Sequence, residues 1–426
     1  MPEPWCPLVH VAEIDLIDPS RLEPLLEWLR RGERAAGAIH FPSGVVQPDG
    51  RLDLCKQALG PAGLEALLGP LREGAPPHWL LGTNALGDEG AAILAERLAG
   101  PGESPATVYL GCNRIGGPGA GRLAEAIASR DAVEALWLKR NPLGLEGARA
   151  IARLVGRVRR LRVLDLTNTQ LGDEGVALVL SAIVECGCPI EHLYLDANGA
   201  SERAAGFAAR VLASSGSLRS LQLGLNPLGD EGARSIVRGL ETSRSLETLG
   251  LGSAGLGPAA VAELSDRAGA HPRLSALDLG RPRATRPLGG EPNRLGDEGA
   301  RHVAAFLRRT RSLRRLDLSG NGITSRGARA LALAVGESSA RLRAVSLGKG
   351  IAESIRRELR AAMAAGPSDP LPAHVAAIRS VYRTIPPRSE DERGSSDRRL
   401  GTTPVGSRSA AGDHVGDPEP LRGPVP

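Results

Sequence analysis

The dominant pattern in the sequence is a short apolar alternation, L-x-L, followed by an Asn and then by a further Leu or Ile. Successive copies lie 27 to 29 residues apart, with one interval of 39. The first apolar position of each copy falls at Leu52, Trp79, Val108, Leu136, Leu164, Leu193, Leu221, Leu249, Leu277, Leu316 and Val345. Eleven copies at a near-constant period predict one small structural unit that is stacked many times.

Each unit predicts one strand and one helix. The alternation within L-x-L places both apolar side chains on the same face of a short strand. The stretch that follows, as in Gly90–Leu98, has the apolar spacing of an amphipathic helix. Stacked units therefore give an α/β solenoid, with parallel strands on one face and helices on the other. Helices are wider than the strand spacing of about 4.8 Å, so the strand face must be concave and the helix face convex.

Polar residues at fixed places in the unit have structural explanations. The Asn that follows seven of the strands is expected to bond neighbouring backbone groups, and Thr169 and Ala254 replace it in two other repeats. The acidic residue at the start of several helices interchanges with Pro, which is typical of a first helical turn. We therefore interpret Asp88, Asp173, Asp230 and Asp297 as helix-start residues and not as catalytic carboxylates.

A family resemblance follows from the repeat itself. The run L-D-L-T-N-T-Q-L-G-D-E-G-V at Leu164–Val176 resembles the ribonuclease-inhibitor subtype of leucine-rich repeats, as do Leu221–Ala233 and Leu316–Ala328. The resemblance covers residues 45–360 and implies a horseshoe whose members bind proteins through the concave sheet and adjoining loops. The same subtype includes Ran GTPase activators. Unlike the vertebrate inhibitors, this chain is not rich in Cys, so we do not infer from the resemblance that it inhibits a ribonuclease.

The pattern divides the chain into four parts. Residues 1–45 are expected to form an N-terminal helical cap around an amphipathic helix at Ser20–Arg34. Residues 46–350 form the solenoid, with an insertion at 281–292. Residues 351–384 are expected to form a C-terminal helical cap, with buried contacts at Leu359, Met363, Val375, Ile378 and Tyr382. Residues 385–426 lack apolar periodicity and predict a disordered tail.

The amino-acid composition restricts the kind of core, the class of partner and the cellular location that we expect. Aromatic residues make up only 2% of the chain, so the core must be built from small aliphatic side chains. The basic residues are nearly all Arg, which with the abundant Ala and Gly is typical of a GC-rich bacterial genome. A net charge of +5 is too small to indicate a dedicated nucleic-acid binder. Five irregularly spaced cysteines, no signal peptide and no long apolar run predict a cytoplasmic, monomeric protein without a membrane partner.

No motif in the sequence predicts chemistry. The eight His residues lack metal-ligand spacing, and neither a phosphate-binding G-x-x-x-x-G-K-[ST] loop nor a G-x-S-x-G nucleophile turn occurs. We therefore expect no catalytic residue, no metal and no cofactor, and a protein as the partner.

The middle position of each strand, from Asp53 in the first repeat to Ser346 in the last, predicts which residues face the concave side. Three aromatic residues, Tyr109, Trp137 and Tyr194, fall in this row, and such side chains often anchor interfaces. We expect a partner-binding patch at these three residues together with Lys139, Arg140, Asp165, His192 and Asp196. Incidental exposure, or partial burial beneath a side loop, is the alternative.

The insertion is a second candidate contact. Arg281, Arg283 and Arg286 lie there among prolines, at the end of a strand. Tolerated loop variation would explain the same residues. Two other functions remain open at this point: a GTPase-activating regulator resembling the Ran activators, which usually carry an acidic tail that this chain lacks, and nucleic-acid binding through the arginine-rich insertion.

Overall fold

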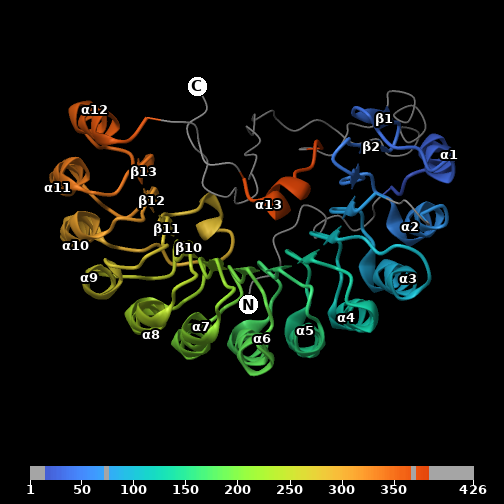
Figure 1. Ribbon diagram of the computed structural model, residues 1–426, viewed down its shortest axis with the longest axis horizontal. Coiled ribbons are helices and arrows are strands. Elements are labelled where there is room, and N and C mark those ends of the chain that lie inside the picture. Colours follow the sequence, from blue (N-terminus) through green and yellow to red (C-terminus); the bar gives the residue numbers. More distant parts are fainter. Residues whose placement is uncertain (1–14, 72–75, 366–370, 383–426) are drawn as a thin grey trace, which may run out of the picture.

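The computed structural model describes residues 15–71, 76–365 and 371–382, and these form a horseshoe with strands inside and helices outside (Figure 1). Within these residues, all strands belong to one sheet of thirteen, ordered β1 to β13 as in the chain. The eleven strands from β3 onward are parallel and correspond to the eleven predicted repeats. The predicted curved α/β solenoid is confirmed.

The strands are three or four residues long. They are β1(Ile39–Phe41), β2(Gly44–Val46), β3(Arg51–Asp53), β4(His78–Leu80), β5(Thr107–Tyr109), β6(Ala135–Trp137), β7(Val163–Asp165), β8(His192–Tyr194), β9(Ser220–Gln222), β10(Thr248–Gly250), β11(Ala276–Asp278), β12(Arg315–Leu318) and β13(Ala344–Leu347).

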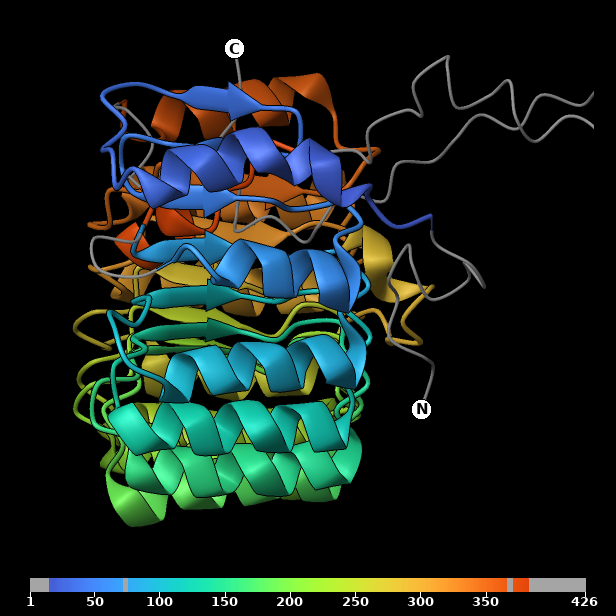
Figure 2. The ribbon, with the colours of Figure 1, turned by 90° about the vertical axis from the view of Figure 1, so that its right-hand side faces the viewer.

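The described helices line the outer face side by side, except for the last one, which lies inside the arc (Figure 1 and Figure 2). They are α1(Glu23–Arg30), α2(Gly60–Leu68), α3(Gly87–Ala99), α4(Gly117–Arg130), α5(Gly144–Arg157), α6(Gly172–Cys186), α7(Glu202–Ser214), α8(Gly229–Thr242), α9(Pro258–Ala268), α10(Gly296–Arg309), α11(Ser325–Glu337), α12(Glu353–Ala362) and α13(Ala373–Ala377), with short 3-10 helices η1(Pro19–Leu22) and η2(Arg283–Thr285). Among the described helices, none is both long and apolar enough to cross a bilayer.

The register of the sheet places the predicted residues in rows. Leu52 pairs with Trp79, and the next position pairs Asp53 with Leu80 and Leu80 with Tyr109. The second row continues along the whole concave face through Trp137, Asp165, Tyr194, Gln222, Gly250, Asp278, Asp317 and Ser346. The first row lies in the core, where every member except the half-buried Val345 is at most 1% exposed. The predicted division between core and concave positions is confirmed.

The repeated Asn residues join neighbouring repeats. The amide nitrogen of Asn141 donates to the carbonyls of Leu138 and Leu110, one in its own repeat and one in the repeat before. Its amide oxygen accepts from the backbone N–H groups of Asn113 and Ile115. Since buried backbone groups need partners, this ladder keeps the strand-to-helix turns in register.

The acidic residue at the start of a helix acts on the following repeat. Asp88 lies in the first turn of α3, and its carboxylate accepts hydrogen bonds from the N–H groups of Gly116 and Gly119 at the start of α4, at 2.6 and 3.1 Å. Asp173 and Asp297 make the same contact with Ser201 and Thr324. The carboxylates therefore cap the neighbouring helix, a structural role that the single repeat does not reveal.

The N-terminal cap contains a hairpin that the sequence pattern did not predict. Leu25, Leu26 and Trp28 of α1 are buried, as expected for a cap helix. Between α1 and the first parallel strand, β1 and β2 pair antiparallel and extend the sheet by two strands. The hairpin covers the open edge of β3, which would otherwise leave its backbone groups unpaired.

The C-terminal end differs from expectation. Leu359 of α12 is buried and Met363 is half-buried against the main core, so α12 covers the last repeat. Residues 371–382 do not continue this cover. Val375 and Ile378 lie instead on the concave face, where they pack on β6 and β7. The segment finds a second apolar surface there, which explains its apolar residues equally well. The predicted tail, 385–426, lies outside the described residues.

The insertion packs back against the solenoid. Ala284 and Thr285 of η2 are buried, and the Thr285 hydroxyl bonds that of Ser253 at 2.8 Å. Asn293, after the insertion, returns to the ladder position and accepts from the N–H of Ala254. η2, drawn in yellow, projects from the rim at which the strands end (Figure 2).

Candidate partner-binding face

Three aromatic rings form a continuous strip across β5, β6 and β8. The ring centroids of Tyr109 and Trp137 are 6.4 Å apart, and those of Trp137 and Tyr194 are 5.3 Å apart. The Lys139 ammonium lies 5.5 Å from the Tyr109 ring centroid, within the range of a cation–π contact. With Ala135 and Val163 the strip forms an apolar cluster that is separate from the main core. We call it the aromatic strip.

The aromatic strip is not open, because residues 371–382 of the same chain lie on it. Trp137 is only 3% exposed, and Val375 and Ile378 pack against it. α13 lies inside the arc, facing the strands (Figure 1). The strip therefore faces the concave side as predicted, but it is partly buried beneath a segment that is remote in sequence.

His374 makes the most specific contact on the strip. Its imidazole stacks on Trp137 with 6.3 Å between centroids and 21° between planes, and it lies 3.7 Å from the His192 ring. The Tyr194 hydroxyl is 3.5 Å from Nε2 of His374. Burial lowers the pKa of His374 to about 3, with a further contribution from His192. Burial also lowers the pKa of His192 to about 4.

The far end of the segment is held by Asp53 of β3. Both carboxylate oxygens accept from the Ser380 hydroxyl, at 2.9 and 3.0 Å, and one accepts from the N–H of Val381 at 2.8 Å. Arg51 donates to the carbonyl of Arg379. The first parallel strand is thus joined to the end of the described chain. Asp53 stood in the predicted concave row, but nothing in the sequence connected it with Ser380.

Two other acidic residues lie close to the aromatic strip. Asp165 is buried on β7, and its carboxylate accepts from the N–H of Thr167 at 2.8 Å. Burial raises its pKa, and burial together with the Asp165 charge raises the pKa of Asp196 to about 8. Arg140 lies in the turn after β6 with a φ of 59°. The predicted partner-binding residues of repeats three to six therefore do come together around the strip.

The half of the concave face from β9 to β13 lies beyond the described contacts of the segment. Its row is polar and small: Gln222, Gly250, Asp278, Asp317 and Ser346. Burial, followed by the charge of Asp317, raises the pKa of Asp278 to about 6. At the rim beside this half, Arg281, Arg283 and Arg286 are exposed and make no ion pair with another described residue.

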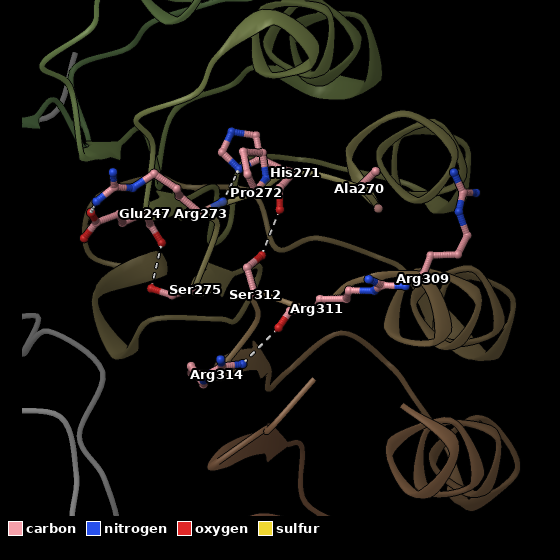
Figure 3. A pocket seen from close by; sticks show the side chains of 11 residues that line it. Glu247, Ala270, His271, Pro272, Arg273, Ser275, Arg309, Arg311, Ser312 and Arg314 are labelled. Atoms are coloured by element: carbon pink, nitrogen blue, oxygen red, sulfur yellow. Dashed lines mark hydrogen bonds and ion pairs between the residues drawn. The ribbon is translucent and has the colours of Figure 1, made fainter. Parts of the chain in front are cut away.

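A separate cavity of about 800 Å³ lies between the loops that precede β11 and β12 (Figure 3). Arg273 on its wall is paired with Glu247 at 2.9 Å. The hydroxyls of Ser275 and Ser312 donate to backbone carbonyls, and Nδ1 of His271 accepts from the N–H of Leu274. These groups join the loops that precede β10, β11 and β12, and neither hydroxyl of the lining bonds a His or carboxylate side chain.

Comparison with known proteins agrees with the repeat pattern. A family model described as "Leucine Rich repeat" matches residues 159–179, 215–237 and 310–332. These stretches contain the three runs in which the sequence pattern is most regular. The chain therefore contains leucine-rich repeats and folds as a curved solenoid.

Two curated relatives share part of this solenoid. The chain is 30% identical to a ribonuclease inhibitor of Mus musculus over 95 residues, which are 22% of this chain and 21% of the inhibitor. It is 28% identical to a ribonuclease inhibitor of Sus scrofa over 177 residues, 41% of this chain and 32% of the inhibitor. The matched stretch thus spans a third or less of either relative.

Among solved structures, a chain described under "Crystal structure of Rad7 and Elc1 complex in yeast" is similar with a TM-score of 0.40 and 14% sequence identity. The match covers 80% of both chains.

Proposed function

We propose that this protein is a non-catalytic scaffold that binds a protein partner through its concave face and adjoining loops. The observation that carries the proposal is the aromatic strip of Tyr109, Trp137 and Tyr194, which forms an apolar cluster outside the main core. A solenoid does not need such a cluster for its stability, because the Leu rows already close the core between repeats. Large aromatic side chains on a concave wall are suited to anchoring a polypeptide.

The surroundings of the strip favour a polypeptide over a small metabolite. The strip extends across several strands, and a peptide segment already lies on it through apolar packing and ring stacking, with its far end held by Asp53. The relatives' name, ribonuclease inhibitor, describes proteins that act on another protein. The exposed arginines 281, 283 and 286 at the rim would supply a charged contact at the edge of the same partner.

The test compares capture by matched variants. The tagged chain and its Trp137→Ala variant are used to capture proteins from the native host, with Leu333→Ala, a 58% exposed residue of α11, as the control. We expect one protein to be enriched by the wild type and the control and lost with Trp137→Ala. With that protein purified, Trp137→Ala is expected to cost about 2 kcal/mol of binding free energy.

Circular dichroism establishes that the variants keep their fold. Equal capture by the wild type and Trp137→Ala contradicts the proposal. Enrichment of nucleic acid, with an affinity that falls steeply as salt is raised, would favour the arginine-rich insertion as a nucleic-acid site instead.

A further inference from the structure

We propose that residues 371–382 are a displaceable intramolecular ligand of the aromatic strip, and that the partner is an extended polypeptide that competes with this segment for the strip and for Asp53. The inference deepens the proposed function, since it concerns the same face. It also has a test of its own that does not require the partner.

The contacts of the segment are those of a bound peptide. Val375 and Ile378 supply apolar side chains, His374 stacks on Trp137, and Ser380 and the Val381 N–H bind Asp53. The segment lies about 180 to 330 positions away from its contacts in sequence, as the Tyr194–His374 and Asp53–Val381 separations of 180 and 328 record. It crosses the strands and adds no strand to the sheet, so its removal leaves every backbone ladder intact.

One polar group of the aromatic strip has no hydrogen-bond partner in the docked segment. The indole N–H of Trp137 is buried and has no hydrogen-bond partner among the described residues. A buried donor without an acceptor weakens the complex that buries it. A partner that places a carbonyl or carboxylate oxygen at this N–H would therefore bind the strip better than the chain's own segment does.

The side chains of several residues of the segment also remain outside the contact. Leu371 and Val381 are 42% and 45% exposed, and Ala373 and Ala376 are exposed as well. A structural cap would bury its apolar residues more fully, as α12 does with Leu359 at 4% exposure. Partial burial and an unsatisfied indole are the features of a ligand that can leave.

The test uses a fluorescein-labelled peptide of residues 371–382 and the full-length chain. Val375→Asp places a charge against the apolar cluster and is expected to release the segment. Ala376→Asp places the same charge on an exposed neighbour and serves as the matched control. Because the attached segment competes at high effective concentration, we expect the peptide to bind Val375→Asp about tenfold or more tightly than the wild type or Ala376→Asp.

A second pair of substitutions locates the binding site. In the Val375→Asp chain, Asp53→Asn should weaken peptide binding, because Asp53 holds Ser380 and Val381. Asp317→Asn is the matched control: Asp317 has the same place on β12 and the same local bond to the N–H two residues on, but makes no described contact with the segment. Equal peptide affinity for the wild type and Val375→Asp overturns the inference, and so does an affinity that Asp53→Asn leaves unchanged.

Each of the two proposals can be contradicted without the other. If the peptide behaves as expected but Trp137→Ala leaves partner capture unchanged, the intramolecular contact stands and the proposed function fails. If capture depends on Trp137 while the peptide results are negative, the face binds a partner and the segment is only a passive cover.

Discussion

The imidazole ring centroids of His192 and His374 lie 3.7 Å apart, although the two residues are 182 positions apart in the chain. Both rings are uncharged at neutral pH, because burial lowers the pKa of His374 to about 3 and that of His192 to about 4. Trp137 and Tyr194 contact His374, the Arg219 charge acts on His192, and the carboxyl groups of Asp165 and Asp196 act on Tyr194. Burial raises the pKa of both carboxyl groups, so each carries less negative charge at a given acid pH than an exposed carboxyl group would.

This pair predicts that acid weakens docking of the segment. The pKa of His374 lies near its ordinary value of 6.5 when the segment is free and is lowered when it is docked, so the contact is fully present above pH 6.5 and is lost as pH falls toward 3. We expect the affinity of the labelled peptide for the Val375→Asp chain to fall about tenfold between pH 7.5 and 5.5. A His374→Phe peptide, which stacks but does not titrate, should lose much less. If the affinities of the two peptides fell in parallel with pH, His374 would not be the group responsible for the pH dependence.

Asn141 provides a test of the ladder. Asn141→Ala leaves the buried carbonyls of Leu110 and Leu138 and the N–H of Asn113 without their partner. We expect a loss of at least about 2 kcal/mol in the free energy of unfolding, measured by urea denaturation. Asn141→Thr should lose about 1 kcal/mol less, because Thr169 at the same position still donates to the Leu166 carbonyl. Equal losses would mean that the hydrogen bonds do not determine the effect.

Substitutions of Asp88 and Glu89 distinguish helix capping by a carboxylate from a general effect of negative charge near the helix start. Both are exposed at the start of α3, but only Asp88 accepts hydrogen bonds from the N-terminus of α4. Asp88→Ala is expected to cost about 1 kcal/mol of unfolding free energy, and Glu89→Ala much less. Thermal unfolding of the two variants measures the difference. Similar losses would indicate a general effect of charge on the helix.

Leu359 and Val375 distinguish the cap from the docked segment. Leu359→Ala removes a buried side chain from the cover of the last repeat, and we expect a loss of about 2–5 kcal/mol in unfolding free energy. Val375→Ala, in a segment that packs only on the concave surface, should cost less than about 0.5 kcal/mol. A large loss for Val375→Ala would make residues 371–382 an integral part of the folded solenoid.

The local pattern of apolar residues is sufficient to predict most of the solenoid. Leu52, Trp79 and Val108 were assigned to one row because alternation within a strand allows only two faces, and the sheet confirms the pairing. The hairpin of β1 and β2 was missed, because residues 39–46 carry no copy of the repeat. The role of Asp88 was assigned to its own helix, since one repeat seen alone does not contain the helix that it caps.

The sequence by itself determined the repeat, the register of the eleven strands and the row in which Asp53, Trp137 and Tyr194 face inward. These features depend on neighbours in the chain and on a period that recurs. Only the tertiary structure decided what lies on that row. Val375 and Ile378 could cover either the last repeat or the aromatic strip, because apolar periodicity specifies that a side chain is buried and not which surface buries it. The bond from Ser380 to Asp53 spans 327 positions and forms because the last described segment lies inside the arc, where it reaches the first parallel strand.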